Sequence, residues 1–298
     1  MSVIDNSTIT PEIMRPQISE LHRVIKVLFN RWIVIGGSII ILGLIIIAIF
    51  APFIAPYDPT MPDLKFILAQ PSRDHLLGTD QTGRDVLSQV IYGSRISLLV
   101  GITGVAIAGI IGMILGLTAG YFSGWANSII MRFTDALLAL PPLVLMLSIA
   151  AVLGSGLFNV LIAIGIGMMP TYCRLMCGQV ISLKENDYVL AAKAIGASHI
   201  RIMSRHLLPN AFPPLLVLIT LNLGTAIIME ASLSFLGIGI LPPAITWGYM
   251  ISNGQRFILT NPLLSFVPGI SILLVVLSFN LVGDGFRDAL DPRLRGTL

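Results

Sequence analysis

Residues 32–50 read WIVIGGSIIILGLIIIAIF, a run without a single charged side chain. A helix needs about 20 apolar residues, each rising 1.5 Å, to cross the hydrocarbon layer of a bilayer. Mostly polar residues precede this run, and it is longer than the roughly 7–15 residue core of a cleavable signal sequence. We therefore interpret 32–50 as a retained transmembrane helix.

The whole chain has the composition of an integral membrane protein. Of its 298 residues, 55% are apolar and only 11% are charged, and the mean hydropathy is +0.90. Soluble domains carry about a quarter charged residues. The runs do not alternate polar and apolar residues as barrel strands do. The predicted fold class is therefore all-α with six transmembrane helices, at about 32–51, 96–120, 130–153, 157–177, 212–237 and 264–283.

The lysines and arginines predict the orientation of these helices. Cytoplasmic loops are enriched in both residues. With both termini in the cytoplasm, thirteen of the 18 fall on that side: Arg15, Arg23, Lys26, Arg31, Arg132, Arg174, Lys184, Lys193, Arg201, Arg205, Arg287, Arg293 and Arg295. Net charge is only +3 and no basic stripe is present, so no nucleic-acid partner is expected.

These helices divide the chain into five predicted parts. A cytoplasmic tail (1–31) leads into the first helix (32–51), and an extracytoplasmic segment (52–95) follows it. A core of five helices (96–284) contains a polar loop (184–210), and a second cytoplasmic tail (285–298) ends the chain.

Glycine and proline mark the helices as more than plain lipid-facing rods. Gly112, Gly116 and Gly120 recur every four residues, which lets another helix approach closely. Prolines interrupt the third, fourth and sixth runs and predict kinks there; they are Pro141, Pro142, Pro170 and Pro268. Kinked, glycine-rich bundles are typical of helices that tilt around a pathway, although static bundles contain them too.

A few polar side chains fall inside the apolar runs, where they are costly and mark either pathways or packing contacts. Glu230, Asn222 and Asn280 are such residues, and both roles stay open for them. Arg132 and Asp135 lie one helical turn apart, so we expect them to form a local pair at the cytoplasmic interface.

The candidate catalytic patterns are weak. His75, Asp80 and Asp85 suggest a hydrolytic cluster, but no G-x-S-x-G elbow or H-E-x-x-H motif accompanies them. We expect turn and helix-capping roles for them instead. No G-x-x-x-x-G-K-[ST] loop occurs, so the chain is expected to bind no ATP or other cofactor itself.

Cys173 and Cys177 lie four residues apart, on one helical face, with no His, Asp or Glu nearby in the sequence. We expect them to pack between helices and bind no metal.

The polar loop contains Asp187–Asn210, DYVLAAKAIGASHIRIMSRHLLPN. Asn186 or Asp187 can cap a short helix that ends at Ala194, before Gly196. Ser198 can cap a second helix up to Leu208, ended by Pro209. On the second helix, an apolar face and a basic face are predicted: Ile200, Met203 and Leu207 on one, Arg201 and Arg205 on the other.

Helices this short are marginal in water, so another surface must pack on them. An amphipathic helix on anionic lipid is one alternative, and it would show a bulky apolar face. Ala191 and Ala192 instead favour insertion into a groove of another protein.

This loop resembles the E-A-A loop of type I ABC-importer permeases, whose pattern is E-A-A-x3-G-x9-I-x-L-P. Leu190 stands where the pattern has Glu, and His206 stands where it has Ile. The resemblance implies an ATPase-coupling loop formed by Leu190, Ala191, Ala192, Gly196, Ala197, Arg201, His206, Leu208 and Pro209.

Three further stretches resemble the C-type permeases of the dipeptide/oligopeptide/nickel branch of that family. They read HLLGTDQTGRDVLSQVIYGSRISLLVG (75–101), EASLSFLGIG (230–239) and FNLVGDGFRDALDPRLR (279–295), with Trp247-Gly248 between the last two. The resemblance covers nearly the whole chain and implies the type I importer fold with a cytoplasmic coupling helix pair.

The resemblance also implies partners. They are a related B-type permease, two ATP-binding subunits that use ATP and Mg²⁺, and an extracytoplasmic substrate-binding protein, all at the bacterial inner membrane. The expected cargo is short peptides, with nickel chelates or glutathione as alternatives. A self-contained secondary transporter would show inverted repeats and paired ionisable residues at mid-membrane, and neither is clear in the sequence.

Overall fold

The computed structural model describes residues 31–290, and in these residues the chain is all helical. The elements are α2 (Trp32–Ile49), α3 (Ala51–Ile54), η1 (Leu64–Phe66), α4 (Val86–Phe122), α5 (Gly124–Leu138), α6 (Pro142–Leu153), α7 (Leu157–Leu183), α8 (Asp187–Ala194), α9 (His199–Arg201), η2 (Ile202–Leu207), α10 (Leu208–Phe235), α11 (Trp247–Gly254), η3 (Gln255–Phe257) and α12 (Leu263–Leu290). The predicted tails fall largely outside this range, at 1–30 and 291–298.

Among the described residues, five helices are long and apolar enough to cross a membrane: α2, α4, α7, the helix that ends in α10, and α12. The third predicted span, 130–153, falls on α5 and α6, which meet at an angle of 93°. The bend falls at Pro141-Pro142, where Pro141 is extended and α6 starts at Pro142. Proline restricts the residue before it to extended conformations, so the sequence break predicted here is confirmed as a sharp bend rather than a kink.

Several helices extend beyond the spans predicted within them. The helix α4 begins at Val86, before the predicted start of the second span at about 96. The helix α7 ends at Leu183, after about 177, and α12 continues to Leu290, after about 283. The early start of α4 has a local cause, because the Asp85 carboxylate accepts a hydrogen bond from the Ser88 N–H at 2.8 Å and caps the helix. Hydropathy marks the apolar part of a helix, whereas its caps mark its ends.

The other two prolines, Pro170 and Pro268, lie inside α7 and α12, and both helices continue through them. Neither proline therefore ends a span.

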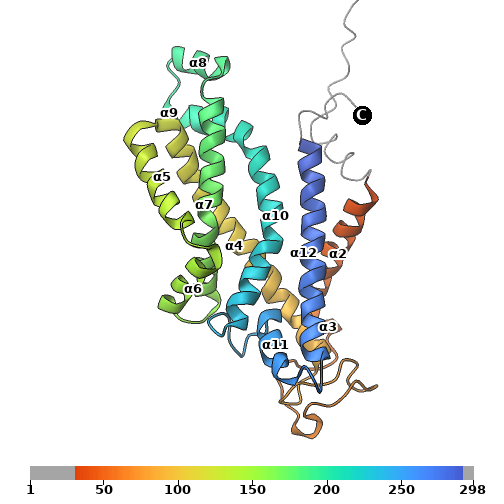
Figure 1. Cartoon of the computed structure of the whole chain (residues 1–298). Helices are drawn as coiled ribbons and strands as arrows, with labels where there is room; N and C mark the ends of the chain where they lie inside the picture. The colour runs from red at the N-terminus through yellow and green to blue at the C-terminus, as the bar shows by residue number, and fades with distance from the viewer. Residues whose placement is uncertain (1–30, 291–298) are drawn as a thin grey trace, which may run out of the picture.

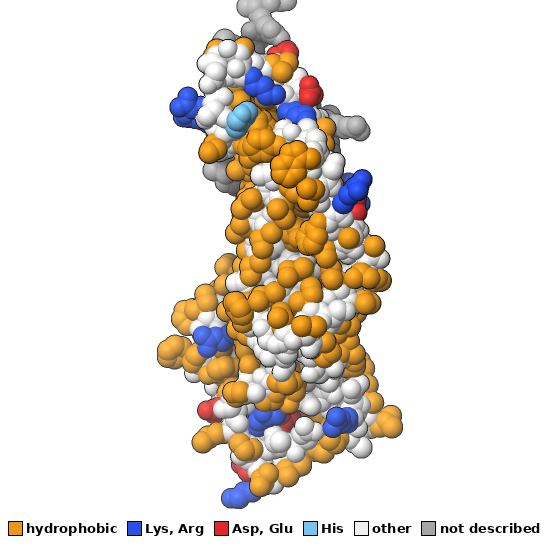
Figure 2. Space-filling view, turned by 90° about the vertical axis from the view of Figure 1, so that its left-hand side faces the viewer, with side chains coloured by type: hydrophobic (Ala, Val, Ile, Leu, Met, Phe, Trp, Pro, Cys, Tyr) orange, Lys and Arg blue, Asp and Glu red, His pale blue; other side chains and the backbone are white. Residues whose placement is uncertain are grey.

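The helices run between two ends of the molecule (Figure 1). The start of α2, the end of α12 and α8 lie at one end, while α3, α11 and residues 55–85 lie at the other. Arg31 and Asp288 form an ion pair that joins the first turn of α2 to the last turn of α12. On the face shown in Figure 2, a band without charged side chains crosses the middle of the molecule. This distribution fits a protein whose middle lies in hydrocarbon.

The tightest helix contact joins α4 to α7 and depends on the predicted glycine ridge. A Cβ atom added to Gly112 would lie 2.6 Å from the Tyr172 Cβ, and one added to Gly120 would lie 2.7 Å from the Val180 Cβ. Gly116 faces Met176 in the same way. The ridge thus packs directly on the backbone of α7, as the small-xxx-small spacing predicts.

Both cysteines lie in this contact as buried side chains, as expected. The Thr134 hydroxyl donates to the Cys173 sulfur at 3.5 Å, and the Asn127 amide donates to the Cys177 sulfur at 3.4 Å. These bonds attach α5 to α7.

Residues 55–85, here called the polar segment, are loops held by two carboxylates. The Asp80 carboxylate accepts hydrogen bonds from the Thr82 N–H (2.7 Å), the Arg84 Nε (2.8 Å) and the Gln89 amide (2.8 Å). The Asp85 carboxylate lies 3.1 Å from the His75 Nδ1 and accepts a bond from the Ser88 hydroxyl at 2.7 Å. Both carboxylates therefore bond the turns around them, which is the turn and helix-capping role expected for them.

Candidate functional site

The predicted coupling loop forms a compact corner at the α8 end, here called the α8 corner (residues 184–210; Figure 1). Its first helix, α8, begins at Asp187, and Asn186 holds the N-cap position without a side-chain capping bond. The predicted end at glycine is confirmed. Gly196 has φ +77°, its N–H bonds to the Lys193 carbonyl at 3.0 Å, and the Ala197 N–H bonds to the Ala192 carbonyl at 3.1 Å. This is the Schellman arrangement, which requires a left-handed residue at that point.

The second predicted helix is only partly correct. Ser198 caps α9, because its hydroxyl accepts a bond from the Arg201 N–H at 3.4 Å. The helix does not end at Pro209, however; it widens into the π-helical turn η2 and continues as α10. Pro209 lies in the first turn of α10, where a missing N–H is tolerated. The α8 corner is therefore continuous with the fifth span.

The π-helical turn changes which side chains face inward. Ile202 and Leu207 are buried, while Ile200, predicted to share the packing face, is 78% exposed. Ile202 and Leu207 are five residues apart, the spacing of i→i+5 hydrogen bonding in a π-helix. A regular 3.6-residue period could not identify this pair.

An apolar cluster fixes the corner on the ends of α4 and α7. Val189 and Ala192 from α8 and the pair Ile202 and Leu207 pack with three residues of the long helices: Leu117, Met176 and Val180. The two alanines expected to form one bare surface are therefore split, since Ala192 is buried in this cluster and Ala191 is exposed.

The outer side of the corner presents apolar side chains where polar ones would be expected. Ile195 is 85% exposed and Leu190 is 45% exposed, and Ala191, Ala194 and Ile200 accompany them. Sequence reasoning missed Ile195, although a β-branched apolar residue directly before a helix-ending glycine was a visible signal. We call these five residues the apolar cap.

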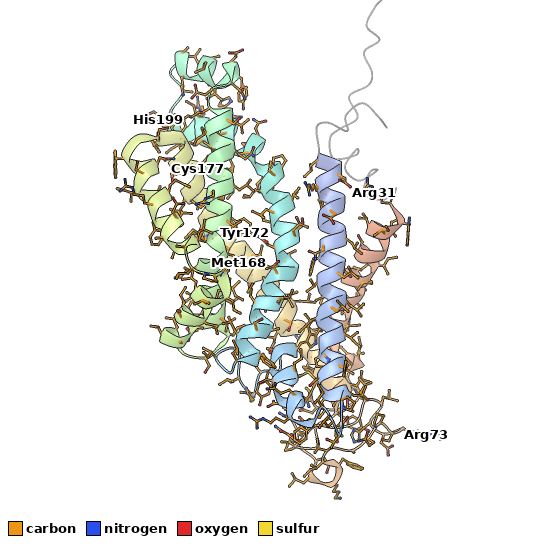
Figure 3. The ribbon with its side chains drawn as sticks, in the orientation of Figure 1. Arg31, Arg73, Met168, Tyr172, Cys177 and His199 are labelled. Carbon is orange, nitrogen blue, oxygen red and sulfur yellow. The ribbon has the colours of Figure 1, made fainter. Side chains whose placement is uncertain are left out.

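Polar bonds also clamp the corner to the end of α4. The Tyr121 hydroxyl lies 2.7 Å from the His199 Nδ1, and the Lys184 ammonium donates to the Ser123 hydroxyl at 2.6 Å and to the Gly120 carbonyl at 3.3 Å. Figure 3 shows His199 beside the end of α4. The corner therefore cannot shift without moving α4 and α7.

The remaining coupling-loop residues differ in accessibility. Arg201 and Pro209 are exposed, while Ala197, His206 and Leu208 are half-buried. The backbone carbonyl of His206 accepts a hydrogen bond from the Asn210 side chain at 2.7 Å, and Leu208 packs at the edge of the apolar cluster.

Glu230, one of the polar residues inside the spans, is fully buried near the end of α10. Its carboxylate accepts a bond from the Ser234 hydroxyl at 2.8 Å, and that hydroxyl accepts from the Ile240 N–H at 3.1 Å. Glu230 thus holds the turn that follows α10.

The two asparagines differ. The Asn222 amide donates to the Tyr172 hydroxyl at 3.0 Å, which joins α10 to α7 (Figure 3), whereas Asn280 is exposed on α12.

The predicted pair of Arg132 and Asp135 is wrong. Asp135 forms its ion pair with Arg174 on α7, so it joins two helices instead of stabilising one. Within residues 31–290, no group of three or more His, Cys, Asp or Glu side chains could hold a metal ion.

The long apolar helices define the class of this protein as a multi-pass membrane protein. The chain belongs to the family of inner membrane components of binding-protein-dependent transport systems, whose pattern matches residues 110–296. Residues 19–71 match the N-terminal transmembrane domain of oligopeptide transport permease C. The resemblance to C-type permeases is therefore confirmed.

Individual relatives agree with this assignment. The chain is 44% identical to a dipeptide transport system permease of Alkalihalophilus pseudofirmus, over 96% of this chain and 94% of the relative. It is 44% identical to a probable D,D-dipeptide permease of Escherichia coli K12 (88% of each chain) and 40% identical to a glutathione permease of Pectobacterium atrosepticum (89% of each).

A solved structure supports the fold. The chain resembles a crystal form of the MetNI methionine ABC transporter, in inward-facing conformations, with a TM-score of 0.56 and 18% identity, over 69% of this chain and 98% of the other. The expected importer-permease fold is confirmed. Members of this family are transport components and are not themselves catalytic.

Proposed function

We propose that this chain is the permease subunit of an ATP-driven importer of short peptides and forms half of the translocation pathway. The apolar cap carries the proposal. Leu190, Ile195 and Ile200 are exposed on an element fixed to α4 and α7, and exposed apolar surface of this kind marks a protein contact. The occupant we infer is an ATP-binding subunit, which uses ATP and Mg²⁺ and moves the corner.

The remaining partners follow from the family. We infer a B-type permease that completes the pathway, two ATP-binding subunits, and an extracytoplasmic protein that delivers the peptide. The α8 end then faces the cytoplasm, together with both termini, and the polar segment faces outward across the bacterial inner membrane. Lysine and arginine enrichment at the α8 end supports this orientation.

Peptide cargo is favoured because two of the most similar relatives are named for dipeptides. Glutathione is the alternative, because relatives at 40–43% identity are named for glutathione. Uptake of labelled dipeptide and of labelled glutathione by the same purified complex decides between them.

Reconstitution tests the transport proposal. Proteoliposomes should contain both permeases, the ATP-binding subunits and the binding protein. They should accumulate labelled dipeptide only when ATP is present on the side of the membrane that carries the ATP-binding subunits. Accumulation by this chain alone, without ATP-binding subunits, would indicate a secondary transporter instead.

The apolar cap can be tested separately. Ile195→Asp places a charge in the inferred contact and should reduce recovery of the ATP-binding subunits with the purified permease by at least about tenfold. Leu259→Asp is a matched control, because Leu259 is 95% exposed in the turn between η3 and α12, at the end of the molecule opposite α8. Equal loss with both variants, or no loss with Ile195→Asp, contradicts docking at the cap.

A further inference from the structure

A hollow of about 530 Å³ lies at the end of the molecule opposite α8, between the first turns of α4 and two loops. Its volume falls in the range of small-molecule sites. The lining residues include Asp58 and Thr60 from the loop after α3, Tyr92, Arg95 and Leu99 from α4, and Ile245 from the loop before α11.

The hollow carries two opposite charges that are not paired with each other. Among the described residues, neither Asp58 nor Arg95 forms an ion pair. The Asp58 carboxylate accepts bonds from the Thr60 hydroxyl and N–H, which lower its pKa. The Arg95 guanidinium lies 6.0 Å from the centre of the Tyr92 ring. A ligand that fits both charges must itself carry an anionic and a cationic group.

The face of α4 that continues from the hollow is apolar. Leu99 lines the hollow and is 44% exposed, and Ile102, Ile110 and Ile114 follow it at helical spacing with exposures of 48–54%. The polar side chain in this stretch, Thr103, donates its hydroxyl to the Leu99 carbonyl at 2.6 Å. A helix face whose polar groups are all satisfied within the helix is suited to hydrocarbon.

The position of Tyr92 and Arg95 also points to the membrane boundary. Tyrosine and arginine are typical anchors where a transmembrane helix leaves the hydrocarbon layer, because each combines an apolar body with a polar tip. The hollow therefore has polar walls at its outer side and opens onto an acyl-chain surface at its inner side.

The geometry points to a binding site for the headgroup of a zwitterionic phospholipid that carries a phosphate and a primary ammonium, as phosphatidylethanolamine does. Arg95 binds the phosphate, and the guanidinium fork suits phosphate oxygens. Asp58 accepts hydrogen bonds from the ammonium, and the acyl chains lie along Leu99 and Ile102. The ligand is a lipid rather than a transported peptide because the hollow continues into an apolar helix face.

Native mass spectrometry of the full-length chain, in its assembled complex, tests the site with two lipids that share palmitoyl-oleoyl chains. The probes are phosphatidylethanolamine and phosphatidylglycerol, which has the phosphate but no ammonium. Arg95→Gln should weaken binding of both lipids about fivefold, whereas Asp58→Asn should weaken only the phosphatidylethanolamine, by about threefold.

One control variant and one competition experiment make the result decisive. Arg73→Gln removes an exposed arginine of the polar segment that does not line the hollow (Figure 3), and it should leave both affinities unchanged. Unaltered lipid binding by Arg95→Gln, or equal effects of Asp58→Asn on the two lipids, would overturn the proposal. Release of one bound phosphatidylethanolamine by added dialanine would assign the hollow to peptide instead.

Discussion

The α8 corner and the polar segment both lie largely outside the apolar spans, and they are held together by different forces. The corner is fixed by a buried apolar cluster and a left-handed glycine, and it leaves isoleucines on its surface. The polar segment is fixed by two hydrogen-bonded carboxylates, Asp80 and Asp85.

The difference shows which part is complete by itself. Hydrogen bonds to the half-buried Asp80 and the buried Asp85 satisfy these carboxylates internally, so the loops around them keep their form without a partner. Only the inner face of the corner packs on other residues of the chain. Its apolar cap is exposed, and the corner gains stability when another protein covers the cap. Substitutions in the polar segment should therefore unfold it locally. Substitutions in the corner should instead weaken the coupling between ATP hydrolysis and transport.

The largest expected effect is at Asp80. Asp80→Ala leaves Arg84 and Gln89 without their partner and should destabilise the polar segment by about 3–5 kcal/mol. Limited proteolysis of the detergent-purified protein should show new cleavage between residues 55 and 85. Asp74→Ala is the control, since Asp74 is exposed and only its backbone carbonyl accepts a hydrogen bond, from the Tyr57 hydroxyl. Equal cleavage of both variants contradicts the central role of Asp80.

The corner should respond strongly to Leu207→Ala, because Leu207 is fully buried in the apolar cluster. Truncation of a buried leucine costs about 2–5 kcal/mol. The midpoint of thermal unfolding should fall, whereas Ile200→Ala, in the preceding helix α9 but exposed, should leave it within about one degree. A similar fall for both variants would mean that the cluster does not hold the corner.

A substitution at Gly196 tests the requirement for a left-handed backbone conformation at the end of α8. No atom lies within 4 Å of a Cβ added to Gly196, so the cost of Gly196→Ala comes from its φ of +77°, about 1–3 kcal/mol. We expect ATP hydrolysis by the complex to become less dependent on the binding protein, and uptake to fall. Gly196→Asn should retain most activity, because asparagine tolerates this conformation. Equal activity of the two variants contradicts a role for the Schellman geometry.

A smaller effect is expected for the clamp between Tyr121 and His199. Tyr121→Phe removes one hydroxyl and its 2.7 Å bond, worth about 0.5–1.5 kcal/mol, while the ring contacts remain. The ratio of peptide transported to ATP hydrolysed should decrease, with unchanged recovery of ATP-binding subunits. Tyr57→Phe removes a comparable hydroxyl bond from the polar segment and should not change this ratio.

Acid should destabilise the polar segment through Asp80. Burial favours the protonated Asp80, but hydrogen bonds from Thr82, Gln89 and Arg84 outweigh it and lower the pKa of this carboxyl. A lowered folded-state pKa contributes stability above the unfolded value of about 3.9, and this stability is lost as the pH falls below it. Protease resistance of 55–85 should therefore be constant from pH 7 to about pH 5 and decline below about pH 4, with a smaller decline in Asp80→Asn.

The sequence by itself determined the features that depend on nearby residues. Apolar runs longer than a bilayer is thick identified the helical membrane class. The glycine spacing predicted that α4 packs closely on another helix, and Asp85 predicted a capping turn. Gly196 predicted the end of α8, and Pro141-Pro142 predicted an interruption of the third span. Each of these depends on bonds within about four residues, or on a composition that permits few alternatives.

Only the tertiary structure decided which remote groups meet. It paired Asp135 with Arg174, buried Ala192 but exposed Ala191, and joined η2 to α10 past Pro209. It also surrounded Glu230 with hydroxyls. These outcomes depend on helices far apart in the sequence, because the side of a helix that becomes buried is set by its neighbours in space. A local period cannot contain that information.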